Sequence, residues 1–264
     1  MIRYWLSVHV KYRRMQNDRG VALIIVLLVT ALLTALVFEF AYNTRVSLRA
    51  AQNFRDGQRA YFLARSGFDF FVKYAGLRDK LPQGEWGVVP IVSAGDTELR
   101  VRWEDEAGKI NINGLRVNSA AFAWLTELFR RQNVSQEILD KIADPASQLQ
   151  LLTELHKFMN DATYNKIAPY VTLTSVPSNK ININTASEDV LRSVLATKSM
   201  ISISAILARR RDQPYTSADL TTDLTDFVAT SNVFKVYFFA TAGGYTTQIE
   251  TIISNNTPVY WRAL

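Results

Sequence analysis

The strongest hydrophobic pattern in the chain is an apolar run of 18 residues, from Val21 to Phe38, which meets no charged residue before Glu39. At about 1.5 Å per helical residue it would span about 27 Å, close to the thickness of the hydrocarbon core of a bilayer. A buried core helix is the alternative interpretation of such a run. We predict a transmembrane helix over Val21 to Phe38.

A basic leader ends at Arg19-Gly20, directly before this run. A secretory signal is cut after its apolar core, whereas the processing point indicated here, between Gly20 and Val21, lies before the core. Cleavage there would leave the hydrophobic helix on the mature protein. Five basic residues precede the helix and three follow within reach, so the positive-inside rule favours a cytoplasmic N-terminus, with the chain after about Ala41 across the membrane.

The helical pattern continues beyond the membrane segment. Apolar residues up to Phe71 recur at three- and four-residue spacings among Arg, Gln and Asp, which predicts one long helix with an amphipathic second half. Gly57 and Gly67 weaken it by about 1 kcal/mol each, and the turn signal Leu81-Pro82-Gln83-Gly84 ends it at the latest. The amphipathic half is expected to rest on a folded domain.

Alternating or β-branched segments near both ends of the remaining chain predict strands. Gly243-Gly244 suits a tight hairpin turn with positive φ, and Asn255-Asn-Thr-Pro258 predicts a second turn. The predicted strands are 88–92, 97–103, 233–241, 245–253 and 259–261.

The residues between these strands read as capped helices. Ser119 and Ser135 each precede an apolar-periodic segment, and Thr185-Ala-Ser-Glu188 matches a capping box. Further helices are predicted over 204–211 and 217–224. The fold class is α+β, an antiparallel sheet with helices inserted between its strands. The predicted divisions are a leader over 1–20, a transmembrane and N-terminal helix over 21–76, a sheet over 77–108 and 230–264, and an inserted helical domain over 109–229.

An internal repeat supports this division. Lys-Ile-Asn-Ile-Asn occurs at 109–113 and again at 180–184. We expect the Ile side chains of each copy to face one side and the Asn side chains to satisfy backbone groups before the next helix, which is a structural role.

The composition argues against catalysis. The chain has no cysteine and only two histidines, His9 in the leader and His156 in an amphipathic segment. This excludes the familiar thiolate and histidine metal sites, and neither a Gly-x-Ser-x-Gly elbow nor a Gly-rich phosphate loop is present. Oxygen ligands alone can hold calcium. Glu104-Asp105-Glu106, Asp140 and Asp144 are candidates, although solvated turn charges are the more common explanation.

One segment, 180–220, resembles a helix-hairpin-helix DNA-binding module. Such modules bind phosphate through the backbone of a glycine-containing hairpin, yet residues 196–202 contain no Gly. Arg209-Arg210-Arg211 could bind phosphate or simply suit a helix C-terminus. A membrane-anchored nucleic-acid-binding protein is therefore the rival hypothesis, and we expect a hairpin scaffold without nucleic-acid binding.

Taken in order, the motifs RGVALIIVLLVTALLTAL, LRAAQNFRDGQRAYFLARSG, GKINING, and APYVTL with KININTASEDVL, resemble the K-class minor pseudopilins of type II secretion systems. The resemblance implies a non-enzymatic subunit at the tip of the pseudopilus, held in the inner membrane by one span with a cytoplasmic N-terminus and a periplasmic bulk. It implies cleavage by prepilin peptidase between Gly20 and Val21, followed by N-methylation of Val21.

The resemblance further implies partners: the I-class and J-class minor pseudopilins, the major pseudopilin, prepilin peptidase and the inner-membrane assembly platform. Ile25 stands where most pilin-like proteins carry Glu, an absence shared by the K class. The resemblance also implies that calcium can be bound. The acidic loop of the family is shortened here to LDKIADPASQLQLL, so no calcium ligands are assigned in this sequence. A minor pilin of a type IV pilus is a closer alternative, against which the large helical insertion argues.

Overall fold

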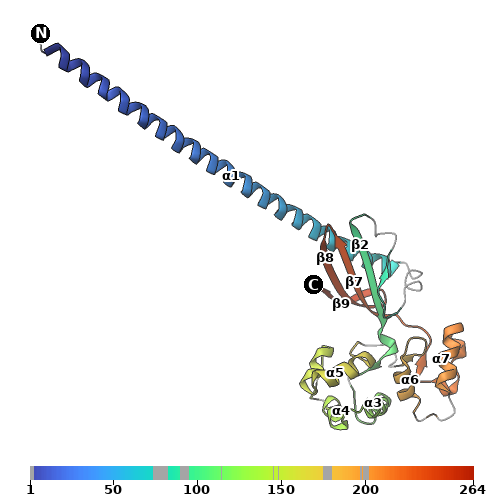
Figure 1. The fold of residues 1–264 in the computed structure, drawn as a ribbon. Helices are drawn as coiled ribbons and strands as arrows, with labels where there is room; N and C mark the ends of the chain where they lie inside the picture. Colours follow the sequence, from blue (N-terminus) through green and yellow to red (C-terminus); the bar gives the residue numbers. More distant parts are fainter. Residues whose placement is uncertain are drawn as a thin grey trace. The chain divides into compact units, whose positions relative to one another are not determined.

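The computed structural model describes the backbone of residues 3–73, 83–89, 95–113, 115–144, 146–147, 149–174, 180–196, 198 and 202–264, and side chains from residue 20 onward. The chain divides into two compact units, Met1–Gln58 and Arg59–Leu264. The first unit is helical throughout its described part, because helix α1 runs over Arg3–Lys73 (Figure 1). The predicted long helix is present, and residues 74–76 of its expected range lie outside the described residues.

The second unit is built around a five-stranded antiparallel sheet with the strand order β1-β2-β7-β8-β9 (Figure 1). The strands are β1 Gly87–Val88, β2 Thr97–Asp105, β7 Val233–Ala242, β8 Tyr245–Ser254 and β9 Thr257–Ala263. The predicted strand over 88–92 is seen only at Val88, and residues 90–92 lie outside the described part. Strands β2 and β7 are neighbours in the sheet, and Asp105 at the end of β2 pairs with Phe234 of β7. The insertion therefore lies between adjacent strands, and the α+β prediction is confirmed.

The two C-terminal hairpin turns follow from their residues. Gly243 and Gly244 adopt φ values of 56° and 83°, and Asn255 and Asn256 adopt 50° and 62°. Two successive positive φ values match the right-handed twist of antiparallel strands, and Gly and Asn tolerate them best. Both turns occur where the sequence predicts them.

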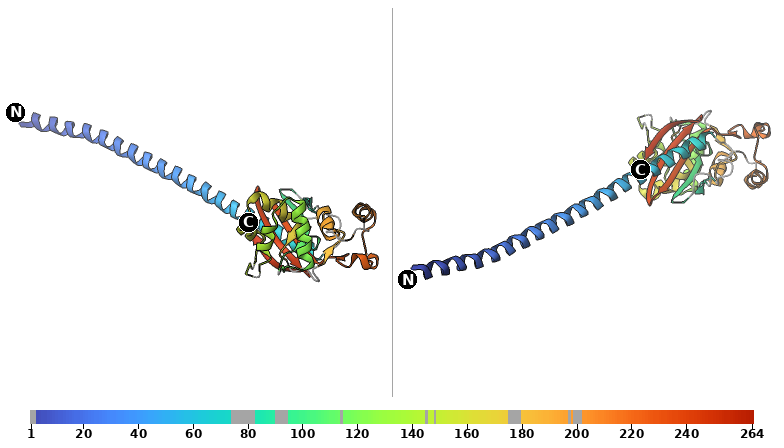
Figure 2. Two further views of the ribbon diagram at one scale, coloured as in Figure 1. Left: turned by 90° about the horizontal axis from the view of Figure 1, so that it is seen from below. Right: turned by 90° about the horizontal axis from the view of Figure 1, so that it is seen from above.

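One face of the sheet packs against the last part of α1, which crosses the strands in Figure 2. Ala64 and Phe71 from the helix pack with Leu99 and Phe238 from the sheet. Gly67 has a packing role here, because a Cβ on it would lie 2.8 Å from Leu99 Cδ2. The helix propensity lost at this position is thus offset by a closer approach of helix to sheet.

The insertion contains short helices. The α-helices are α3 Ala120–Arg131, α4 Gln136–Ile142, α5 Asp161–Ile167, α6 Glu188–Val194 and α7 Ile203–Asp212. The 3-10 helices are η1 Glu106–Gly108, η2 Leu152–Lys157, η3 Ala168–Tyr170, η5 Ser217–Asp219 and η6 Thr222–Leu224. The helix predicted over 217–224 is wrong: the segment forms two 3-10 turns, the first closed by Asp219, which accepts hydrogen bonds from the backbone N–H and the hydroxyl of Thr216 at 2.8 and 2.6 Å.

Two predicted helix caps are confirmed and one is wrong. Ser119 and Ser135 accept hydrogen bonds from backbone N–H groups of the first turns of α3 and α4, at 3.2 and 3.3 Å. The predicted capping box at Thr185 is absent, because Ser187 caps α6 by accepting from the N–H of Val190 at 3.3 Å. The hydroxyl of Thr185 has a tertiary partner instead.

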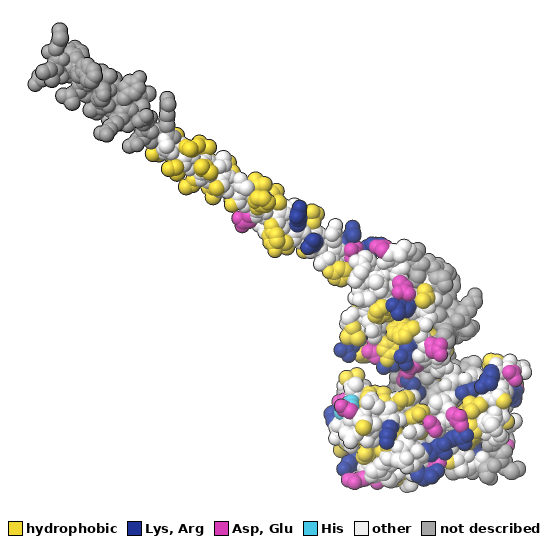
Figure 3. All heavy atoms as spheres, in the orientation of Figure 1, with side chains coloured by type: hydrophobic (Ala, Val, Ile, Leu, Met, Phe, Trp, Pro, Cys, Tyr) yellow, Lys and Arg dark blue, Asp and Glu magenta, His cyan; other side chains and the backbone are white. Residues whose placement is uncertain are grey.

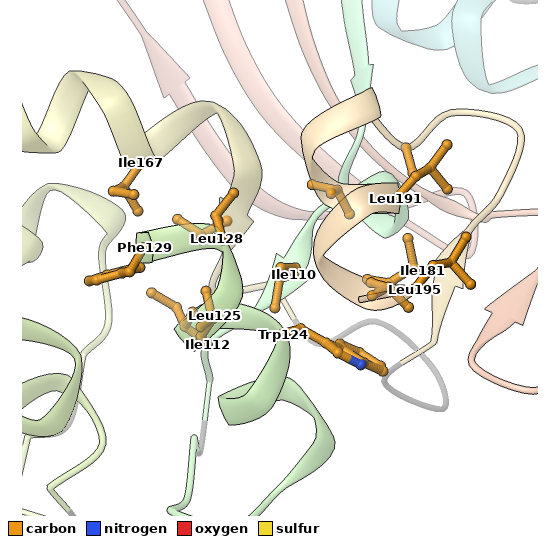
Figure 4. Packing of buried hydrophobic residues seen from close by; sticks show 14 of the residues in the cluster. Ile110, Ile112, Trp124, Leu125, Leu128, Phe129, Ile167, Ile181, Leu191 and Leu195 are labelled. Atoms are coloured by element: carbon orange, nitrogen blue, oxygen red, sulfur yellow. The ribbon is translucent and has the colours of Figure 1, made fainter. Parts of the chain in front are cut away.

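The two copies of the repeat form short parallel strand pairs, which the sequence did not predict. In the first copy β3, Ile110–Asn111, pairs with β4, Val171–Thr172, and in the second β5, Ile181–Asn182, pairs with β6, Phe227–Val228. Between them lies the core of the insertion (Figure 4), where the labelled side chains include Ile110, Ile112, Trp124, Leu125, Leu128, Phe129, Ile167, Ile181, Leu191 and Leu195.

Candidate functional site

The predicted processing point lies on the exposed surface of α1. Gly20 has no atom within 4 Å of where a Cβ would be, and the side chains of Val21 and Ile25 are each 56% exposed. Exposed side chains from there to Glu39, the first charged residue after Arg19, are mostly hydrophobic (Figure 3). The structure therefore places Gly20, Val21 and Ile25 on one uninterrupted helix, where no described side chain covers them.

This helix is, in the described part of the chain, the one segment long and apolar enough to cross a membrane, by length and composition. The two hydroxyl groups within its segment Val21 to Phe38 are satisfied internally: Thr30 donates to the carbonyl of Leu27 at 3.0 Å and Thr34 to that of Thr30 at 2.7 Å. Such bonds remove the cost of an unpaired polar group in hydrocarbon. The segment is suited to a lipid environment or to packing among other apolar helices.

A second candidate site is the buried joint at the end of β2, where the chain leaves the sheet for the insertion. Asp105 is 2% exposed, and its carboxylate accepts three hydrogen bonds. Asn182 Nδ2 and Thr185 Oγ1 donate to Oδ2 at 2.7 Å each, and the N–H of Ala107 donates to Oδ1 at 2.9 Å. A buried carboxylate is stable only with such compensation, so Asp105 fixes the second repeat to the sheet.

The adjacent carboxylate, Glu106, binds the first half of the insertion. It is 4% exposed and accepts a hydrogen bond from the hydroxyl of Thr172 on β4, the strand that pairs with the first repeat. Lys109 Nζ donates to Glu106 Oε1 at 2.8 Å and to Glu104 Oε2 at 2.9 Å. Consecutive carboxylates at one strand end thus connect both halves of the insertion to the sheet.

The charges of the joint reinforce each other. Burial by itself would raise the pKa of Glu104, but Lys109 and Arg102 outweigh it and lower that pKa below its usual value. Burial would likewise lower the pKa of Lys109, whereas Glu106 and Glu104 raise it. These groups are therefore ionised across the physiological pH range.

Close packing completes the joint. A Cβ on Gly108 would lie 2.9 Å from Thr185 Oγ1, 3.0 Å from the carbonyl carbon of Thr185 and 3.1 Å from the amide nitrogen of Ala186. Two of these neighbours are backbone atoms, which move less readily than a side-chain end. Gly108 thus allows η1 to approach the second repeat.

The first Asn of each copy of the repeat acts as predicted. Asn111 Oδ1 accepts from the N–H of Asn113 at 2.8 Å, and Asn182 Oδ1 accepts from the N–H of Asn184 at 3.1 Å. Both turns hold the chain where each repeat leaves its strand. The sequence analysis did not predict that Thr172 and Thr185 donate hydrogen bonds to the carboxylates at the end of β2. The repeat was the one signal in the sequence for this region, because its second copy lies next to Asp105.

The candidate calcium ligands are not brought together. Glu104, Asp105 and Glu106 bind the groups described above, Asp140 accepts from Gln136 Nε2 at 3.3 Å, and Asp144 accepts from the N–H of Ala146 at 2.9 Å. Among residues whose placement is described, no three His, Cys, Asp or Glu side chains group in a way that could hold a metal ion. The described side chains therefore do not fit a calcium site.

The arginine run at the end of α7 is partly committed to internal contacts. Arg209 forms an ion pair with Asp219 and lies over the ring of Tyr215, with its guanidinium carbon 4.3 Å from the ring centroid. Arg210 donates to the carbonyls of Ile183 and Ala186 at 3.0 and 2.6 Å. Arg210 thus holds α7 on the chain at the end of the second repeat, and Arg209 holds it on the segment that follows the helix. Most of the predicted hairpin, 196–202, lies outside the described residues.

His156 is on η2 and exposed. Its ring stacks on Tyr164 with centroids 4.1 Å apart, and its Nδ1 lies 3.2 Å from Asp161 Oδ1. No serine or threonine hydroxyl is hydrogen-bonded to it in the structure's described part, so the geometry does not assemble a hydrolytic triad.

No family model matches the chain. The chain is 26% identical over 265 residues to type II secretion system protein K of Pseudomonas aeruginosa, an alignment that covers 81% of this chain and 78% of the relative. The chain is thus similar over most of its length to a protein K of a type II secretion system. The resemblance predicted from its sequence motifs is thereby confirmed.

One solved structure is also similar to the chain. It is a complex of GspK, GspI and GspJ from the type II secretion system of enterotoxigenic Escherichia coli, and it matches with a TM-score of 0.49 and 15% identity over 84% of this chain and 99% of that chain.

Proposed function

We propose that the chain is a non-enzymatic minor pseudopilin that acts at the tip of the type II secretion pseudopilus, in its assembly and in protein export across the outer membrane. The observation that carries the proposal is the similarity to protein K, which extends over 81% of the chain. An alignment of that length includes most of the folded unit and at least part of helix α1. The uncovered apolar helix supports it, because such a helix can be stored in a membrane and later packed among others.

The proposal includes processing of the N-terminus. Prepilin peptidase removes residues 1–20 by cutting between Gly20 and Val21, and the new amino group of Val21 is methylated. The segment Val21 to Phe38 then holds the mature protein in the inner membrane, with the chain beyond it in the periplasm. The exposed, helical surroundings of Gly20 are compatible with access by a peptidase.

Ile25 supports a position at the tip. A carboxylate at this place in a pilin-like subunit neutralises the buried α-ammonium of a neighbouring subunit, because an unpaired charge in an apolar bundle is costly. Ile25 offers no such partner, which suits a subunit with none above it. The partners below it are the I-class and J-class minor pseudopilins and the major pseudopilin, and the assembly platform is the inner-membrane partner.

Processing can be tested by coexpressing the full chain with prepilin peptidase. At the chain average of 29.9 kDa for 264 residues, loss of 20 residues lowers the mass by about 2.3 kDa. Gly20→Leu should prevent this loss, whereas the matched variant Gly57→Leu, at another uncrowded glycine of the same helix, should be cut normally. A full-length product from the unaltered chain, with a peptidase that cuts a control pseudopilin, would refute the processing step.

Assembly can be tested separately by copurification. The mature chain in detergent should copurify with the I-class and J-class minor pseudopilins of the same secretion system. If the chain copurified with minor pilins of a type IV pilus and not with the I-class and J-class minor pseudopilins, the proposed role in type II secretion would be refuted.

A further inference from the structure

The part of α1 just beyond its apolar segment carries exposed basic side chains (Figure 3). Arg45 and Arg49 are exposed, and within the described part of the chain neither guanidinium has a hydrogen-bond or ion-pair partner. They are four residues apart on one helix, so they lie on the same face, about 40° apart around the helix axis. This face of α1 therefore presents two uncompensated positive charges.

The helix itself supplies no counter-charge to either arginine. Apart from the other arginine, the positions three and four residues from Arg45 and Arg49 hold Ala, Tyr, Leu, Val, Gln and Asn, none of which is acidic. The acid that precedes them, Glu39, is six residues from Arg45 and so lies about 120° away around the axis. Like charges four residues apart repel each other, and an anion that contacts both guanidiniums would relieve this repulsion.

The apolar segment sets the level of these arginines in a bilayer. The 20 residues from Val21 to Phe40, with Glu39 as the one charged residue among them, would span about 30 Å as a helix, which is the thickness of a hydrocarbon core. Arg45 then lies about 7.5 Å beyond the core along the axis, and the headgroup layer is about 5–7 Å thick on each side. Tyr42, 69% exposed, lies between them, at the level where aromatic side chains gather in membrane interfaces.

Helix geometry directs both arginines toward the membrane. The Cα–Cβ bonds of an α-helix tilt toward its N-terminus, which for Arg45 and Arg49 is the side of the apolar segment. Long arginine side chains near the end of a membrane helix extend along the helix to the headgroup layer. The phosphate of a phospholipid is the anion at that level, and a guanidinium binds phosphate oxygens with two parallel hydrogen bonds.

We infer that Arg45 and Arg49 bind the phosphate of an anionic phospholipid at the surface of the membrane into which the apolar helix inserts. A lipid with net negative charge is favoured over a zwitterionic one, because neither arginine has a counter-charge of its own. The inference rests on the proposed storage of the chain in a membrane. It depends neither on cleavage at Gly20 nor on a pseudopilin partner.

The test measures the lipid selectivity of the full chain by native mass spectrometry. The protein is held in detergent micelles that contain equal amounts of phosphatidylglycerol and phosphatidylcholine with the same acyl chains, and the chain should bind phosphatidylglycerol preferentially. An arginine near an anionic lipid surface favours binding by about fivefold. Arg45→Gln and Arg49→Gln should each lower the affinity for phosphatidylglycerol by up to about fivefold and leave the affinity for phosphatidylcholine unchanged.

The matched control is Arg65→Gln, at another exposed arginine of the same helix, 16 residues beyond Arg49. It removes the same charge and should leave the lipid selectivity unchanged, because it lies well beyond the headgroup layer on the helix. The basic leader is present in every variant, so its own contacts with lipid cancel in the comparison.

A second measurement separates the phosphate site from the membrane anchor. The chain has no cysteine, so Val29→Cys allows a single spin label to be placed in the apolar segment, in nanodiscs of phosphatidylglycerol. We expect this label to be shielded from a water-soluble relaxation agent. A label that is accessible from water would overturn both the proposed anchor and this inference.

With the label shielded, three results would overturn the phosphate site alone. The first is an Arg45→Gln/Arg49→Gln variant that keeps the full preference for phosphatidylglycerol, and the second is an equal loss of preference in Arg65→Gln. The third is a double variant with unchanged lipid selectivity that no longer copurifies with the I-class and J-class minor pseudopilins, which would assign the two arginines to a protein partner instead.

Discussion

Replacing Asp105 by Ala tests whether the buried joint holds the insertion on the sheet. The substitution removes one carboxylate that three donors share: Asn182 Nδ2, Thr185 Oγ1 and the N–H of Ala107. Because Asp105 is 2% exposed, water has little access to the groups that lose their acceptor. The variant should therefore lower the free energy of unfolding.

The magnitude follows from the unmade hydrogen bonds. A buried donor left without a partner costs about 1–3 kcal/mol. Three such donors would together cost about 3–9 kcal/mol. Two effects lower this cost: the variant no longer has to desolvate a carboxylate, and water can enter the space that the side chain leaves. We expect a net loss of about 3–5 kcal/mol, near the lower end of the range for three unpaired neutral donors.

The assay is urea unfolding of the full chain in detergent micelles, followed by tryptophan fluorescence, with the free energy extrapolated to zero urea. Trp124, 8% exposed within the insertion, reports on that part of the molecule. The matched control is Asp212→Ala, at an exposed carboxylate at the end of α7, which should change the free energy by no more than about 0.5 kcal/mol.

A double-mutant cycle with Thr185→Val sharpens the test. Both single variants remove the same hydrogen bond, so their combined effect should be smaller than the sum by about 0.5–3 kcal/mol. Additive effects, or an Asp105→Ala variant as stable as Asp212→Ala, would refute the assignment of Asp105 as the buried link.

Three further predictions concern the joint and the two cores. The lowered pKa of Glu104 stabilises the fold at pH values above the ordinary pKa of 4.5, and this stability is lost as the pH falls through the folded-state pKa. The raised pKa of Lys109 stabilises the fold below the ordinary pKa of 10.5, and this stability is lost as the pH rises through the folded-state pKa. In urea titrations Glu104→Gln should therefore flatten the fall in unfolding free energy between about pH 5 and pH 2, and an unchanged slope would count against the ion pair. Gly108→Ala should cost about 1–3 kcal/mol through overpacking, while Gly57→Ala, with open space around it, should be neutral or stabilise the helix by up to about 1 kcal/mol; equal effects would disprove the close approach. Phe238→Ala, at a fully buried position between sheet and helix, should cost about 3–5 kcal/mol and lower the midpoint of thermal unfolding, and a loss below about 1 kcal/mol would contradict its place in the core.

Much of the fold could be predicted because its signals are local. The apolar run of α1, the alternation along β2 and β7, the Gly243-Gly244 turn and the Ser119 cap each depend on residues a few positions apart. The candidate processing point at Gly20 was also a local pattern, and it stays a prediction. What the sequence suggested less well were short elements, such as the 3-10 turns over 217–224, where few residues carry the periodicity.

The sequence by itself determined the membrane-length helix, the α+β plan and the family resemblance, since periodicity, turn chemistry and ordered motifs can be read along one dimension. Only the tertiary structure decided that Asp105 meets Asn182 and Thr185, 77 and 80 residues away, and that Ser187 caps α6. These outcomes depend on which buried polar groups find partners when distant segments pack, and that competition leaves no local pattern in the chain.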